Sequence, residues 1–409
     1  MTQILFRNAA IVDGTSPQAR RGCDVLVEGN LIREVADRPI AAASATIVDL
    51  AGKSLLPGLI DCHVHVCAAD VDLGRNATLP SSLVAVHAAR NLRAMLLRGF
   101  TTARDASGAD FGLKLALEQG LIEGPRLFLT GKALSQTGGH ADYRGRFDGR
   151  LASHYLGRLG AIGRVVDGLA EVRRAVREEI KAGADFIKLM GSGGVSSPTD
   201  PIDFLGFSRE EVLAVVEEAR NARTYVMAHL YPDEAIVRAV ECGVHSVEHG
   251  NLVADAGARL MAARGAFAVP TLVTYEAIGE HGKALGFPPV SLAKLDAVRR
   301  AGLGSLEIFK RHGVKMAYGS DLLGSLHDRQ SDEFVIRGRV LPAHEVIASA
   351  TSMSAELVGM AGKLGVIAPG ALADLIVVDG DPLADLSRLG GQGRHLPYIM
   401  KDGVFAKRP

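Results

Sequence analysis

The chain has 409 residues, of which 47% are hydrophobic and 22% are charged. This composition is ordinary for a globular protein, and the length exceeds what one core usually organises, so we expect one large domain plus a smaller one, or two comparable domains. Lys plus Arg and Asp plus Glu number 46 each. That balance argues against a general affinity for nucleic acid or for an anionic membrane surface.

Membrane segments and disulfides are not expected either. The N-terminal stretch MTQILFRNAAIVDG has no long apolar run after basic residues, and no run of about 18 apolar residues exists. The 4 cysteines form no CxxC pair, which makes a disulfide framework or a cysteine-based zinc site unexpected. We therefore expect a cytoplasmic protein that binds neither nucleic acid nor a membrane.

The two ends of the chain have the pattern of β-structure. Short apolar runs separated by Gly, Asp and Asn fill residues 1–57, and the turn at Gly29 is typical of a tight hairpin. Residues 364–409 repeat this pattern, with a second hairpin turn at Gly403. A small β-domain built from 1–57 and 364–409 is the prediction.

Residues 58–363 alternate between short apolar strands and longer amphipathic helices. For example, the strand-like run DFIKLMG is followed by REEVLAVVEEARNA, whose apolar residues have helical spacing. Such an α/β alternation predicts a parallel sheet, either doubly wound or closed as a (β/α)8 barrel. The long Gly-rich stretch 131–164 is expected to be a lid or binding loop, or else an insertion without a role.

A His-x-His pair follows the apolar run PGLI. Side chains two apart in a strand point to the same face, so His63 and His65 should project together, with Asp61 on the same side. Two imidazoles at this spacing can hold one divalent metal. A pair of surface histidines in a loop is the alternative.

Lys188 lies inside the apolar run ADFIKLM. A buried ammonium is costly, so it needs a carboxylate partner or a neutral state. A neutral amine can take up carbon dioxide and become a carbamate, an anionic oxygen ligand able to bridge two metals. A salt bridge with an interior carboxylate is the simpler alternative.

Three further polar residues each close an apolar, strand-like segment: His229 after TYVMA, His249 after VHSVE and Asp321 after VKMAYGS. Active sites of parallel α/β folds lie at the carboxyl ends of strands, which would bring these residues together. His140 in the long loop and His327 after Asp321 are candidates for approaching the same site.

The runs LPGLIDCHVHV, ADFIKLMGSGGVSSPTD, MAHLYPDEA, SVEHG and AYGSD together resemble the metal-dependent amidohydrolase superfamily. Within it, the chain is most similar to the imidazolonepropionase-like group, which contains Xaa-Pro dipeptidase-type and Xaa-Lys/Arg carboxypeptidase-type enzymes. QTGGHAD resembles that group's TGGHGD motif, with Ala141 in place of Gly.

The resemblance implies a (β/α)8 TIM barrel with a small β-sandwich domain built from both chain ends. It also implies a site for two divalent metal ions, most often Zn2+. His63 and His65 would bind the first metal, and His229 and His249 the second. The family often self-associates, so a homo-oligomer is expected.

Lys188, carboxylated by carbon dioxide, would bridge the metals, and Asp321 would ligate the first. The resemblance further implies that a hydroxide bridging the metals attacks an amide carbon, with Asp321 as general base and acid. His140 would be catalytic by hydrogen-bonding the carbonyl oxygen, and Tyr231 and Tyr143 would contact the substrate.

The expected small-molecule substrate is a dipeptide or an N-acyl amino acid. A non-peptide C–N bond, as in a cyclic amide, an arylurea or a xenobiotic amide such as ochratoxin, is the alternative. A barrel that serves only as a non-catalytic scaffold is a more remote one.

Overall fold

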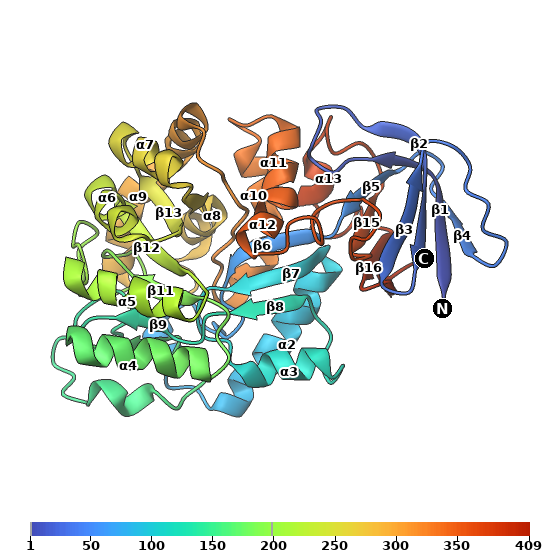
Figure 1. Cartoon of the computed structure of the whole chain (residues 1–409). Helices are drawn as coiled ribbons and strands as arrows, with labels where there is room; N and C mark the ends of the chain where they lie inside the picture. The colour runs from blue at the N-terminus through green and yellow to red at the C-terminus, as the bar shows by residue number, and fades with distance from the viewer. Residues whose placement is uncertain (1, 198) are drawn as a thin grey trace.

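The structure is a computed structural model that describes residues 2–197 and 199–409 (Figure 1). Strands from both chain ends form one sheet at one side of the molecule, and both termini lie beside it. The helices surround the remaining strands on the other side. Within the described residues, no helix is both long and apolar enough to cross a bilayer.

The sheet of the chain ends has eight strands, in the order β17-β16-β15-β5-β1-β2-β3, with β4 also paired to β1. The hairpin turns predicted at Gly29 and Gly403 are confirmed, because they join β2 to β3 and β16 to β17 in antiparallel pairs. The strands are β1 (Gln3–Ile11), β2 (Arg20–Glu28), β3 (Leu31–Ala36), β4 (Thr46–Asp49), β5 (Ser54–Pro57), β15 (Leu375–Val378), β16 (Tyr398–Lys401) and β17 (Val404–Lys407).

The middle of the chain forms two parallel sheets, of order β6-β7-β8 and β10-β9-β11-β12-β13-β14. Strands β6 and β7 are buried at every residue, as expected of parallel strands covered on both faces. Their bounds are β6 (Leu59–Val64), β7 (Phe100–Asp105), β8 (Arg126–Leu129), β9 (Ala133–Ser135), β10 (Gly163–Val165), β11 (Ile187–Met190), β12 (Val226–Pro232), β13 (Ser246–Leu252) and β14 (Phe267–Val269).

Helices connect these strands, which confirms the predicted α/β alternation. The α-helices are α1 (Leu73–Asn76), α2 (Ser81–Leu97), α3 (Phe111–Glu118), α4 (Gly168–Lys181), α5 (Arg209–Asn221), α6 (Asp233–Cys242), α7 (Asp255–Arg264), α8 (Leu272–His281), α9 (Pro289–His312), α10 (Asp332–Arg337), α11 (Ala343–Ser349), α12 (Ser352–Leu357) and α13 (Ser387–Gly390). Two 3-10 turns, η1 (Ala152–Tyr155) and η2 (Gly324–Arg329), complete the elements.

Local sequence explains where several of these helices begin and end. Ser208 and Glu211 form a reciprocal capping box at the start of α5. Left-handed glycines stop three helices, because only glycine adopts this conformation without strain. These are Gly243 after α6, Gly265 after α7 and Gly313 after α9.

Backbone hydrogen bonds link the two parallel sheets at both of their edges. On one side, the amide of Asp185, before β11, donates to the carbonyl of Leu129 in β8 at 2.8 Å. On the other, Ala268 of β14 forms a bridge with Met316, and Cys62 of β6 donates to Tyr318 at 2.8 Å. The segment 316–321 therefore lies between β14 and β6.

Candidate metal centre and active site

The nine residues predicted to bind metal, to catalyse or to contact the substrate all line one cavity at the carboxyl ends of the parallel strands. They are His63, His65, His140, Tyr143, Lys188, His229, Tyr231, His249 and Asp321. The free volume of this cavity is about 30 Å3, which is room for a water molecule. A larger ligand therefore needs the lining side chains or loops to move.

Asp321 lies at the centre of the histidine cluster. Its Oδ1 is 3.1 Å from Nε2 of His65 and 3.5 Å from Nε2 of His63, and its Oδ2 is 3.9 Å from Nδ1 of His249. Ligand atoms of His63, His249 and Asp321 lie within 4.8 Å of one another, close enough to surround a metal ion. The rings of His229 and His249 are 4.6 Å apart, which brings His229 into the same cluster.

The hydrogen bonds of these imidazoles fit a metal site. Nδ1 of His65 lies 3.0 Å from the carbonyl of Ser107, and Nδ1 of His249 lies 2.8 Å from Oγ1 of Thr271. Nε2 of His63 is buried and has no hydrogen-bond partner among the described residues. Protein metal sites commonly use imidazoles that are held from behind in this way and have the other nitrogen free.

The lowered pKa values of three of the histidines also suit metal binding, whereas contact with Asp321 raises the pKa of His65. Burial lowers the pKa of His63 and His229 below the usual value and that of His249 to about 3. Burial likewise lowers the pKa of the Lys188 ammonium to about 8, although Glu248 and Asp321 partly oppose this shift. Neutral imidazoles are the form that binds metals, and a neutral amine is the form that reacts with carbon dioxide.

Two of these residues have strained backbone conformations. The φ angles of His249 and Asp321 are 71° and 53°, in the left-handed region that non-glycine residues rarely adopt. Such strain persists only where the surroundings fix it, and it is concentrated at functional sites. For Asp321, the surroundings include its own amide, which donates to the carbonyl of His63 at 2.8 Å.

The side chains assigned to the substrate form the wall of the cavity. The ring of His140 stacks on His229 at 4.1 Å, and its Nδ1 lies 2.8 Å from Oγ of Ser197. The hydroxyls of Tyr231 and Tyr275 are 2.9 Å apart. The long loop 131–164, which contains the strands β9 and β10, thus brings His140 to the cluster.

One expectation about a neighbouring residue is wrong. Asp61 does not share the face of His63 and does not line the cavity, since its carboxylate accepts hydrogen bonds from Ser320 and from Gln330. His327 is buried, its Nε2 lies 3.2 Å from the carbonyl of Ala68, and it is not among the residues that line the cavity.

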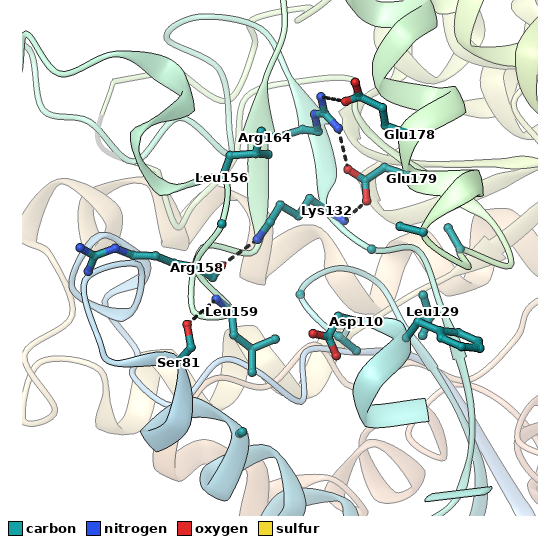
Figure 2. Close-up of a pocket in the computed structure, with 18 of the residues that line it drawn as sticks. Ser81, Asp110, Leu129, Lys132, Leu156, Arg158, Leu159, Arg164, Glu178 and Glu179 are labelled. Carbon is teal, nitrogen blue, oxygen red and sulfur yellow. Dashed lines mark hydrogen bonds and ion pairs between the residues drawn. The ribbon is translucent and has the colours of Figure 1, made fainter. Parts of the chain in front are cut away.

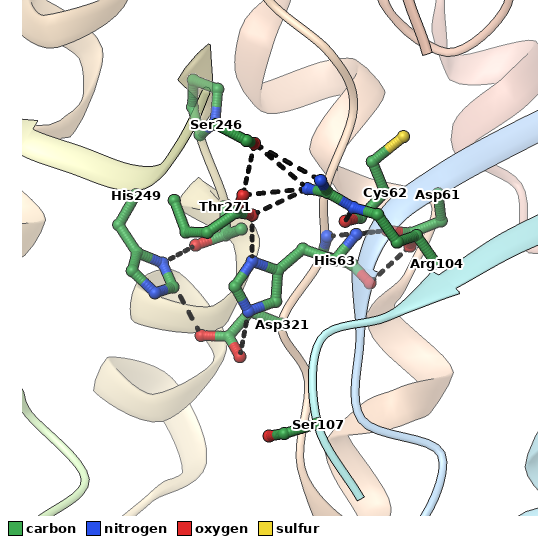
Figure 3. A network of polar contacts seen from close by, with 12 residues as sticks. Asp61, Cys62, His63, Arg104, Ser107, Ser246, His249, Thr271 and Asp321 are labelled. Carbon is green, nitrogen blue, oxygen red and sulfur yellow. Dashed lines mark hydrogen bonds and ion pairs between the residues drawn. The ribbon is translucent and has the colours of Figure 1, made fainter. Parts of the chain in front are cut away.

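The sequence did not predict the residues that support His63 on the side of its ring facing away from the cavity. Glu248 lies 2.7 Å from Nδ1 of His63, and Arg104 pairs with Glu248 at 2.9 Å. Figure 3 shows this network behind His63, with Asp321 on the opposite side of the ring. A charged residue inside an otherwise apolar strand, as in FTTARD and VHSVEHG, was the available signal.

A second hollow, of about 630 Å3, lies outside this site, between α2, α3, α4 and the loop 156–164. Several of its charged groups have partners (Figure 2): Arg164 pairs with Glu178 and Glu179, and Lys132 donates to the carbonyl of Arg158.

Comparison with known proteins identifies the family. Residues 54–403 match the amidohydrolase family, so the chain belongs to that family, and the resemblance of its motifs is confirmed. It is a hydrolytic enzyme that acts on C–N bonds. Metal dependence is general in this family.

Relatives with a named activity share between 31% and 51% of their residues with this chain. A solved prolidase complexed with N-methylphosphonate-L-proline is 51% identical, with a TM-score of 0.98 and full coverage of both chains (100% each). A Xaa-Pro dipeptidase with bound methionine is 31% identical, with a TM-score of 0.87, covering 99% of this chain and 100% of that one. Ochratoxinase from Aspergillus niger is 33% identical over 370 residues, covering 87% of this chain and 76% of that protein.

Proposed function

We propose that the protein is a binuclear metal-dependent hydrolase that cleaves the amide bond of a dipeptide or an N-acyl amino acid. The observation that carries this proposal is the convergence of imidazoles, a buried lysine and a carboxylate on one cavity. These residues come from separate strands, and an arrangement of this kind suits two divalent ions such as Zn2+.

In this proposal His63, His65 and Asp321 hold the first metal, and His229 and His249 hold the second. When bound, such ions lower the pKa of water and polarise a substrate carbonyl. The orphaned Nε2 of His63 and the grouping of its ring with His249 and Asp321 support the assignment.

Lys188 is proposed to bridge the metals as a carbamate. Its burial, with 1% exposure, and its lowered pKa support a neutral amine able to add carbon dioxide. The amine nitrogen bonds to the carbon of carbon dioxide and releases a proton, which gives an anionic oxygen donor.

The chain's own side chains then move the protons. Asp321 accepts a proton from the attacking water and returns it to the leaving nitrogen. His140 donates a hydrogen bond to the carbonyl oxygen as negative charge develops there. The central place of Asp321 among the histidines and the stacking of His140 on His229 support these roles.

Tyr231 and Tyr143 are proposed to contact the substrate, Tyr231 at its carboxylate. Apolar side chains such as Leu73, Ile162 and Ile278 line the rest of the cavity, which favours an uncharged substrate side chain. The likeness to a prolidase at 51% identity makes Xaa-Pro dipeptides the first substrates to test.

The alternative substrate is a non-peptide amide. One specific observation favours it: the 33% identity to a protein named ochratoxinase. Turnover of a panel of Xaa-Pro and other dipeptides, N-acyl amino acids, arylureas and ochratoxin A would separate these classes. We expect a dipeptide with an apolar side chain to have the highest kcat/KM, and a preference for ochratoxin A would overturn the assignment.

The scaffold alternative is remote for a member of a hydrolase family. A scaffold needs no metal, whereas the proposed enzyme binds zinc stoichiometrically. Elemental analysis of purified protein therefore tests the proposal independently of substrate choice. Purified protein that is active but contains no metal would contradict the metal-centre proposal.

We also propose that residues 58–363 form a closed (β/α)8 barrel and that residues 1–57 and 364–409 form a separate β-sandwich domain. The hydrogen bonds that join β8 to β11 and β14 to β6 through segment 316–321 support closure. The shared sheet of the chain ends supports the division. We also propose that the enzyme is cytoplasmic and forms a homo-oligomer.

A further inference from the structure

A fully buried ion pair lies behind His63, on the side of the ring that faces away from the cavity. Nη2 of Arg104 donates to the two carboxylate oxygens of Glu248 at 2.9 and 3.1 Å, and both side chains have 0% exposure. Oε2 of the same carboxylate lies 2.7 Å from Nδ1 of His63. These three side chains form a continuous chain of contacts from the core to the cavity (Figure 3).

This arrangement determines which nitrogen of His63 carries the proton. A carboxylate only accepts hydrogen bonds, so Nδ1 of His63 donates to Glu248. In the neutral imidazole, Nε2 is then an acceptor with a free lone pair. Nε2 is also the atom that lacks a hydrogen-bond partner among the described residues and faces Asp321 at 3.5 Å.

Arg104 and Ser246 fix the orientation of the carboxylate. Oγ of Ser246 lies 2.5 Å from Oε1 of Glu248, and Nη2 of Arg104 is closer to Oε1 than to Oε2. Arg104 also donates to the carbonyl of Cys62 at 2.6 Å, so it holds the strand that carries His63. Oε1 thus receives the bond from Ser246 and the shorter bond from Arg104, whereas Oε2 receives the longer bond from Arg104 and is directed to His63.

We propose that Glu248 and Arg104 are positioning residues of the metal centre: Glu248 holds His63 as the Nδ1–H tautomer with Nε2 available to the metal, and Arg104 holds the carboxylate of Glu248 in its orientation. This inference rests on the proposed metal centre. It extends that proposal by giving a role to a buried pair outside the ligand set.

The variant Glu248→Gln tests the tautomer directly. The two shorter bonds, from Arg104 and from Ser246, both reach Oε1, so the amide oxygen takes that side and the NH2 group faces His63. This NH2 group is a donor, so Nδ1 of His63 must accept and the proton moves to Nε2, where it blocks the ligand atom. We expect zinc affinity, measured against a fluorescent chelator, to fall by about 100-fold, the upper end for loss of such a partner.

The second readout is the 15N chemical shifts of His63 in metal-free protein. They report the Nδ1–H tautomer in the parent protein and the Nε2–H tautomer in the Glu248→Gln variant. A purely structural role of Glu248 would leave the tautomer unchanged. This measurement needs no metal, so it tests the inference even if the parent protein binds no zinc, a result that would instead defeat the metal-centre proposal.

Glu333→Gln is the matched control. Glu333 and Arg337 form another ion pair at 2.7 Å with 0% exposure on both sides, within α10. The control removes the same charge from a buried arginine without contacting a metal-site histidine. We expect a comparable loss of thermal stability and an unchanged zinc affinity.

The double variant Arg104→Met, Glu248→Gln covers the case in which Glu248→Gln fails to fold. It leaves no unpaired buried guanidinium, and replacing a whole buried pair by neutral groups is well tolerated. Its amide is free to turn its oxygen toward His63, so we expect a zinc affinity about 10-fold below that of the parent. A parent-like affinity and tautomer in Glu248→Gln, a parent-like affinity in the double variant, or an equal loss of affinity in Glu333→Gln would overturn the inference.

Discussion

At the scale of single residues, the carboxylate of Asp321 lies among three of the proposed metal ligands. It approaches His63, His65 and His249 within 3.1 to 3.9 Å. Asp321→Asn keeps the shape of the side chain but removes the proton acceptor. We expect kcat to fall by a factor on the order of 100 to 10,000, the usual contribution of a general base, with circular dichroism unchanged.

Asp328→Asn is the control for that prediction, since it makes the same exchange seven residues along the chain. The Asp328 side chain is 87% exposed, and within the described residues its one ion pair is with Arg98, at 3.6 Å. Its kcat should match that of the parent. A Asp321→Asn variant with near-parent turnover would exclude Asp321 as the general base.

Residue identity was enough to select the cavity-lining side chains, but not their supports. His63, Lys188 and Asp321 stand out because each is a polar residue at the end of an apolar strand. Glu248 and Arg104 are equally polar and equally buried, but their use depends on which groups face them across strands, and sequence spacing does not specify that. The predicted orientation of the Asp61 side chain was wrong for the same reason. Alternation along a strand predicts which face a side chain occupies, but hydrogen bonds from Ser320 and Gln330 hold this one elsewhere.

At the scale of elements, Asp61 connects β6 to the segment that carries Asp321. Its Oδ1 accepts from the amides of His63 and Ser320, and its Oδ2 accepts from Oγ of Ser320 and from Gln330. Asp61→Asn replaces one acceptor with a donor, which leaves buried donors unsatisfied. We expect a loss of about 1–3 kcal/mol in the free energy of unfolding, measured in urea.

Because Asp61 also fixes the backbone next to Asp321, the same variant should have a lower kcat. Gln330→Ala, which removes one of the donors to Asp61, serves as a milder comparison. If the Asp61→Asn variant has the same stability and the same kcat as the parent, this connecting role of Asp61 is refuted.

The capping box of α5 gives a prediction that concerns stability alone. Ser208→Ala removes the side chain that accepts from the amide of Glu211. We expect a loss of about 1 kcal/mol in the free energy of unfolding, with kcat and KM unchanged, because α5 lies on the outside of β11 and β12. A change in kcat without a change in stability would contradict this separation of roles.

Helices and strands of this kind were predictable because their signals are local. The capping box, the terminal glycines and the amphipathic spacing of REEVLAVVEEARNA all lie within one element. The short strands β9 and β10 were not predicted, since each has three residues and depends on pairing with a distant strand: β9 with β11 and β10 with β9. The loop 131–164 was recognised by length and composition, whereas its path over the cavity depends on tertiary contacts.

At the scale of the whole molecule, the proposed metals should stabilise the fold as well as catalyse. The ligands come from β6, β11, β12, β13 and the segment after β14, so bound ions would cross-link strands from both parallel sheets. Metal that binds only the folded state adds about 2.7 kcal/mol at a free concentration 100 times its Kd. Removal by a chelator should lower the Tm and abolish activity, and zinc should restore both.

The control for this experiment is the Lys188→Ala variant, which lacks the proposed bridging group. Its Tm should respond less to chelator and to added zinc than that of the parent. A parent Tm insensitive to both treatments would argue against metals that span the strands.

The most direct test of the central claim is a crystal structure of the zinc-loaded protein with anomalous data collected at the zinc edge. The account predicts two zinc peaks enclosed by the side chains of His63, His65, Lys188, His229, His249 and Asp321, with density for a carbamate on Nζ of Lys188. Zinc bound elsewhere, with this cavity empty and Lys188 an unmodified amine, would contradict it.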